Sequence, residues 1–151
     1  MVVMVSQEDG KLFYQLFRKS DSAETVVLHP SPLGLERSDG SFAEKLKLVQ
    51  RSEGKPLSES YSMISGKQKE HSWSANEASL LFKNRDGKQI EMVFRLFDEG
   101  LAFRYVFPGN SEEKVTVVSE ATGFAVTEGA DAWMSPYQPA TPWGNPAGRV
   151  P

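Results

Sequence analysis

Three large aromatic side chains lie close together near the end of the chain: Trp133, Tyr137 and Trp143. Sugar rings present apolar C–H faces that stack on tryptophan and tyrosine, while polar side chains bind the hydroxyls. The surrounding sequence is rich in proline and has no periodicity that would assign these rings to a core. We expect a sugar platform or a domain interface here, with plain packing onto the fold as the alternative. Trp73 lies on a predicted strand and is expected to pack in the core or at an edge.

Two arginines stand in the middle of an apolar hairpin, in the stretch FRLFDEGLAFRYVFPGN at residues 94–110. Placing the apolar residues on one face aligns Leu96 with Phe103 and puts Arg95 opposite Arg104. Like charges directly opposed across an antiparallel pair are unfavourable. Arginines on a covered face also need carboxylates or carbonyls. The candidate carboxylates within the chain are Glu91, Glu120 and Glu128.

Other residue types that carry chemistry are absent or poorly arranged. The chain has no cysteine, which excludes disulfides, cysteine-ligated zinc and a thiol nucleophile. His29 and His71 are far apart in sequence and lack metal-ligand spacing. Glycoside hydrolysis needs two carboxyl groups across a sugar-sized cleft, but the acidic residues are expected in solvated turns or at a cap. Those residues are Asp98, Glu99, Glu112, Glu113 and Asp131.

The overall charge gives no sign of a nucleic-acid partner. The 17 basic and 20 acidic residues give a net charge of −3, whereas nucleic acid calls for a concentrated basic patch. No segment is apolar and long enough for a membrane span or a signal peptide. Because Met1 stands directly on a predicted strand, we expect that a leader was trimmed or that the chain is a piece of a longer protein.

The predicted fold is all-β, since short alternating segments are separated by turn residues. Asp9-Gly10, Asp39-Gly40 and Asp86-Gly87 each suit a tight hairpin turn. The segment 41–49 allows either a helix with a capping box or a strand. The predicted strands span residues 2–6, 12–18, 25–28, 46–50, 59–63, 70–74, 79–83, 89–97, 101–107, 115–119 and 124–127.

Both faces of the predicted hairpins are apolar, so both should be covered. Pairing around Asp9-Gly10 places Val5 and Tyr14 on one face and Met4 and Phe13 on the other. One cover would come from a second sheet of a sandwich, and the other from more sheet or from another domain. We assign residues 1–136 to the β-sandwich. Residues 137–151 are predicted to be a proline-rich extended tail that runs across a surface.

Four stretches resemble, in order, landmarks of the N-terminal β-domain of glycoside hydrolase family 97. The sequence departs from that pattern where Trp133 is followed by Met134 in place of a second tryptophan, and little matches after Pro136. The four stretches are SPLGLERSDGSF at 31–42, YSMISGK at 61–67, FRLFDEGLAFRYVFP at 94–108 and DAWMSP at 131–136.

The resemblance implies a large antiparallel super-sandwich like that of galactose mutarotase, here truncated, that packs against a missing (β/α)8 catalytic barrel. It implies a periplasmic or secreted α-glucosidase or α-galactosidase whose active-site calcium and catalytic carboxylates lie outside this chain. The chain itself would be non-catalytic, need no cofactor and help to form the carbohydrate-binding cleft, with Trp133, Tyr137, Trp143, Arg95 and Arg104 as sugar-binding or interface candidates. The alternatives are a stand-alone carbohydrate-binding module or a structural, protein-interaction sandwich.

Overall fold

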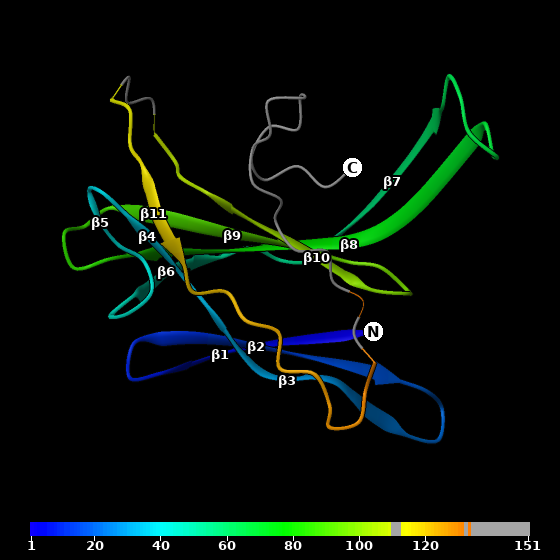
Figure 1. Cartoon of the computed structure of the whole chain (residues 1–151), viewed down its shortest axis with the longest axis horizontal. Helices are drawn as coiled ribbons and strands as arrows, with labels where there is room; N and C mark the ends of the chain where they lie inside the picture. The colour runs from blue at the N-terminus through cyan, green and yellow to red at the C-terminus, as the bar shows by residue number, and fades with distance from the viewer. Residues whose placement is uncertain (110–112, 132, 134–151) are drawn as a thin grey trace, which may run out of the picture.

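The computed structural model describes residues 1–109, 113–131 and 133, and this part of the chain is built from strands without a helix. All strand pairs are antiparallel. The predicted all-β class is therefore confirmed. The strands form three sheets, of which two face each other across the core (Figure 1).

The first sheet has the order β1-β2-β3, from strands β1 (Val2–Glu8), β2 (Lys11–Lys19) and β3 (Glu24–Leu33). Asp9 and Gly10 form the predicted tight turn, with φ angles of 48° and 76°. This turn fixes the register that pairs Val5 with Tyr14, as the alternation of apolar residues predicted.

The second and largest sheet is organised around one long strand, β8. Its other strands are β6, β7, β9 and β10, and β8 pairs with β7 along its first half and with β6 along its second. The bounds are β6 (Lys47–Arg51), β7 (Lys55–Ser62), β8 (Glu70–Lys83), β9 (Gln89–Leu96) and β10 (Leu101–Val106).

The sequence predicted β8 as two separate strands, 70–74 and 79–83, and this was wrong. Ala75, Asn76, Glu77 and Ala78 have low intrinsic strand propensity, but pairing with β7 or β9 holds them in the strand. Beyond the last β8–β9 pair, Asn76 with Leu96, β8 has only β7 beside it. We call residues 57–75 the arm, which bends away from the first sheet (Figure 1).

The third sheet is small and has the order β11-β4-β5, from β4 (Leu35–Arg37), β5 (Gly40–Ser41) and β11 (Val117–Glu120). The helix considered for 41–49 does not form, because Lys45 adopts a left-handed φ of 56° and the chain turns into β6. The predicted strand at 124–127 is reduced to one bridge between Leu28 and Val126.

The core lies between the first and second sheets. Tyr14 of β2 contacts Phe103 of β10 with ring centroids 5.4 Å apart, which shows the two layers in direct contact. Phe42 and Leu46, from the connection into β6, are also buried there. The buried cluster is Leu12, Tyr14, Leu33, Phe42, Leu46, Phe82, Ile90, Met92 and Phe94.

The register of the β9–β10 hairpin differs from the prediction by two residues. Phe94 pairs with Phe103, and Arg95 faces Ala102 instead of Arg104. Phe97 N–H donates to the Gly100 carbonyl at 2.9 Å, which centres the turn on Asp98-Glu99. A two-residue shift keeps both arginines on one face, but it makes them diagonal neighbours and relieves the direct opposition of like charges.

Candidate functional site

Arg95 lies on the face of the large sheet that points away from the core. Its Nε donates to Glu77 Oε2 at 2.8 Å, and its guanidinium lies 5.5 Å from the centre of the Trp73 ring. The sequence had offered Glu91, Glu120 or Glu128 as the counter-ion, and for Arg95 this was wrong. Glu77 was missed because it fell in the predicted gap within β8, although it stands directly opposite Arg95 in the β8–β9 register.

Positively charged side chains from several strands lie near the Glu77 carboxylate. The hydrogen bond from Arg95 lowers the pKa of Glu77 despite opposing burial, and the charges of Arg95, Lys55 and Arg104 lower it further. Lys55 Nζ lies 3.8 Å from Glu77 Oε1. Glu77 is therefore an anion that organises the basic groups on this face.

The two arginines border a hollow of about 150 Å³ that is also lined by Val93, Ala102 and Phe103. Val93 is only 8% exposed, whereas Arg104 is exposed. A second hollow of about 300 Å³ adjoins it through Val93 and Arg104 and includes Glu77 and Glu91. The structure thus brings together the two predicted arginines on one face of mixed charge and small apolar groups.

The predicted aromatic cluster falls mostly outside the described residues. Trp133 is 97% exposed, while Tyr137 and Trp143 lie outside the described range together with the tail 137–151. Their role as a sugar platform or interface stays a prediction.

A larger cleft of about 550 Å³ lies at the base of the arm, and we call it the Trp73 cleft. Trp73 is half-buried, with the Phe97 ring edge-on at 5.7 Å. Trp73 therefore packs at an edge of the sheet, which was one of the two predicted positions. Its ring also borders open space. The lining residues are Ser58, Glu59, Ser60, Ser72, Trp73, Ser74, Phe97, Asp98 and Glu99.

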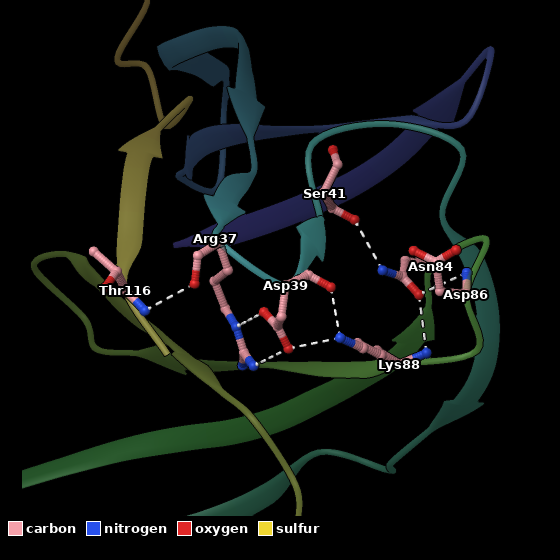
Figure 2. A network of polar contacts seen from close by, with 8 residues as sticks. Arg37, Asp39, Ser41, Asn84, Asp86, Lys88 and Thr116 are labelled. Carbon is pink, nitrogen blue, oxygen red and sulfur yellow. Dashed lines mark hydrogen bonds and ion pairs between the residues drawn. The ribbon is translucent and has the colours of Figure 1, made fainter. Parts of the chain in front are cut away.

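A second polar network, shown in Figure 2, ties the small sheet to the β8–β9 turn. Arg37 donates to both carboxylate oxygens of Asp39, at 2.8 and 2.7 Å, and Lys88 Nζ donates to Asp39 Oδ2 at 2.9 Å. These hydrogen bonds, from Arg37 first and Lys88 second, hold the pKa of Asp39 at about 2. The Arg37 guanidinium also lies 4.1 Å from the centre of the Phe107 ring. The network is internally paired and acts as a structural joint.

The buried Tyr14 and the partly buried Tyr105 hold the returning segment 122–123. Tyr14 donates to the Gly123 carbonyl at 3.0 Å, and the Tyr105 hydroxyl lies 2.7 Å from Thr122 Oγ1 and accepts from Gly34 N–H at 3.1 Å. Burial raises the pKa of Tyr14 to about 12 and raises the pKa of Tyr105 as well. These hydroxyls stay protonated and bridge the layers of the fold.

The described residues contain neither a cluster of metal ligands nor a membrane-spanning helix. No group of three or more His, Asp or Glu side chains among them could hold a metal ion. His71 stacks on Tyr61 with ring centroids 5.3 Å apart. No helix in the described part of the chain has the length and apolar character to cross a membrane.

The family model described as Glycosyl-hydrolase 97 N-terminal matches residues 1–146. The chain belongs to this family of N-terminal domains. The resemblance seen in the sequence is thereby confirmed. Among curated proteins, the probable retaining alpha-galactosidase of Streptomyces bingchenggensis (strain BCW-1) is 32% identical over 113 residues.

Solved structures share the fold of this chain. A beta-arabinopyranosidase structure aligns with a TM-score of 0.71 and 25% identity over 96% of this chain. A family 97 enzyme from Pseudoalteromonas sp. strain K8, solved in complex with panose, aligns with a TM-score of 0.67 and 21% identity over 83% of this chain and shares its fold.

These relatives are much longer than this family 97 domain. The chain spans 17% of the curated alpha-galactosidase, 24% of the beta-arabinopyranosidase and 19% of the Pseudoalteromonas enzyme. Most of each relative therefore lies outside the region that this chain matches.

Proposed function

We propose that the chain is the non-catalytic N-terminal module of a family 97 glycoside hydrolase acting on α-glucosides or α-galactosides. Its role is to pack against a (β/α)8 catalytic barrel and help to form the carbohydrate-binding cleft. The observation that carries the proposal is the family match over residues 1–146 in a chain that spans only 17–24% of its enzyme relatives.

The pKa values of the carboxyl groups among the described residues support a non-catalytic role. A glycosidase general acid needs a raised pKa. Asp39 and Glu77 have lowered pKa values, because each is hydrogen-bonded to an arginine. Asp98 and Glu99, adjacent in a hairpin turn, are exposed.

The outer face at Arg95 and Arg104 is the proposed contact with the barrel. It combines the buried Val93 with the exposed Arg104, a mixture suited to an interface with carboxylates or backbone carbonyls.

Strand β10 is an edge strand with the sequence LAFRYV, which lacks the proline, lysine or bulge that commonly protects an edge. We propose that further strands pair there and complete the large super-sandwich.

The remaining parts of the proposal concern the longer protein. Residues 137–151 would lead from the sandwich, residues 1–136, towards the barrel. Calcium would bind in the active site formed outside this chain, and the native protein would be periplasmic or secreted. Fractionation of source cells and immunoblotting test the periplasmic or secreted location and the greater length of the native protein together. A cytosolic band near 16.8 kDa would contradict both proposals.

The catalytic part of the proposal is tested with the purified chain and nitrophenyl α-glucoside and α-galactoside. We expect no release of nitrophenol above buffer, and turnover that persists through repeated purification would refute the non-catalytic role.

The docking face is tested in the full-length protein with Arg104→Glu. We expect a lower melting temperature or a loss of the domain contact, measured by calorimetry and limited proteolysis. Arg18→Glu, an exposed charge reversal on β2 of the other sheet, is the matched control. Equal behaviour of the two variants would contradict docking through this face.

A further inference from the structure

We propose that the Trp73 cleft is a saccharide-binding site. This assigns ligand binding to the chain itself, at a place distinct from the aromatic residues of the tail. It goes beyond the proposed function, because a site contained in this domain binds sugar whether or not a catalytic barrel is attached.

The first support is a fixed aromatic ring beside open space. Trp73 lies in the arm, where β9 has ended and β8 has only β7 as a neighbour. Arg95 lies 5.5 Å from the ring centre and Phe97 packs edge-on at 5.7 Å, so the indole is held on two sides. A ring that is already ordered loses little side-chain freedom when a ligand binds.

The second support is the placement of unused polar groups around this ring. Glu59 stands directly opposite Trp73 in the β7–β8 register, which places both on the same face. Asp98 and Glu99, from the β9–β10 turn, also line the cleft. Carboxylates pair well with neighbouring sugar hydroxyls, because each offers two acceptor oxygens.

The four serines that border the cleft do not add hydroxyls to the face of the indole. Ser58 pairs with Ser74 and Ser60 pairs with Ser72, so strand alternation points these side chains to the face of the arm opposite Trp73 and Glu59. The polar groups available to a ligand at the ring are therefore the three carboxylates. Within the described part of the chain, the side chains of Glu59, Asp98 and Glu99 make no hydrogen bond or ion pair with each other or with other residues.

The chemistry of the lining selects the class of ligand. Three carboxylates disfavour phosphates and other anions by repulsion. Carboxylates make a poor surface for a wholly apolar ligand, and these carboxylates do not form a metal-binding group among the described residues. A neutral molecule with an apolar ring face and many hydroxyls satisfies both the indole and the polar groups. The volume of about 550 Å³ lies within the range of small-molecule sites and admits a short oligosaccharide.

The test uses the 151-residue chain with panose and melibiose as separate probes, an α-glucoside and an α-galactoside. Substituting Trp133 and Trp143 by Phe leaves Trp73 as the single tryptophan of the three. We expect a saturable change in its fluorescence with a Kd of about 1 mM for at least one probe.

Two variants locate the binding. Glu59→Gln should weaken binding about tenfold, since hydrogen bonds to charged groups are worth about 1.5–3 kcal/mol. Trp73→Ala in the unaltered chain should abolish binding measured by calorimetry, with circular dichroism to check folding. Glu24→Gln, the same change at an exposed position of β3, should bind as the parent does. Because Glu59 is exposed, its variant still decides the matter if the Trp73 variant does not fold.

Three results would overturn the site. The first is a fluorescence that shows no saturable response to either sugar up to tens of millimolar. The second is an equal sugar affinity of the Glu59→Gln and Glu24→Gln variants. The third is a fluorescence change that depends on protein concentration instead of sugar concentration. The third would place a second copy of the chain at the cleft. Hydrolysis of panose by the chain would instead refute the non-catalytic function and leave the binding site standing, so the two proposals fail separately.

Discussion

At the scale of single residues, the SPLGL stretch is a structural joint. Ser31 is fully buried, and its hydroxyl donates to the His29 carbonyl at 2.7 Å and accepts from Ala125 N–H at 2.9 Å. At Gly34, a Cβ atom would lie 2.7 Å from the Cα of Ala43. The stretch therefore fixes a close approach between chain segments.

Gly34→Ala should destabilise the domain by about 1–3 kcal/mol, because the added methyl overlaps backbone that cannot move freely. Urea denaturation measures the change. Gly54→Ala is the control, since nothing lies within 4 Å of a Cβ there. Similar midpoints for the two variants would show that the approach at Gly34 is not tight.

Tyr14→Phe removes the hydroxyl that donates to the Gly123 carbonyl, and this should cost about 1–2 kcal/mol at neutral pH. The pKa of Tyr14 is raised from 10 to about 12, so its stabilising effect is complete below pH 10 and is lost as pH rises towards 12. Urea midpoints at pH 7 and above pH 10 measure it. The gap between parent and variant should narrow in alkali, and a gap that widens would contradict the burial argument.

At the scale of elements, the small sheet depends on its polar joint to the β8–β9 turn. Strand β5 has only two residues, and Asp39 links Arg37 of β4 with Lys88 (Figure 2). Short strands have few ladder hydrogen bonds of their own. The side-chain network therefore holds this corner in place.

Asp39→Asn should lower the melting temperature at pH 7. The pKa of Asp39 falls from 3.8 to about 2 on folding, so the stabilisation is present above pH 3.8 and is lost as pH falls towards 2. The parent and variant should therefore converge in acid, as thermal melts across this range will show. Asp21→Asn, an exposed residue of the turn after β2, should match the parent throughout. A difference that persists at pH 2 would contradict the ion-pair explanation.

At the scale of the whole molecule, apolar surface remains open within the described residues. Phe124, beside Tyr14 of the first sheet, is 63% exposed, Val118 of β11 is 66% exposed, and Met4 is 47% exposed on the outer face of β1. Large open apolar patches commonly mark interfaces.

We therefore expect the isolated chain to oligomerise or to bind a hydrophobic dye, and the longer protein to bind less dye per molecule. Sedimentation and dye fluorescence measure both. A monodisperse monomer that does not bind dye would show that the domain covers these faces by itself.

The sequence alone determined the fold class, the β1–β2 hairpin and the family. These depend on local patterns: alternation of apolar residues, an Asp-Gly turn, and motif stretches that lie in order along the chain. It also placed Arg95 and Arg104 on one face, because strand alternation survives a two-residue register error.

The tertiary structure decided which groups meet. Glu77 became the counter-ion of Arg95 because β9 pairs with β8 through a segment whose own propensity for a strand is low. The Trp73 cleft exists because β8 continues past the end of β9, so that residues of β7, β8 and the β9–β10 turn surround one ring. Such contacts depend on strand lengths and cross-strand register, which are set by pairing between distant segments and not by any one of them.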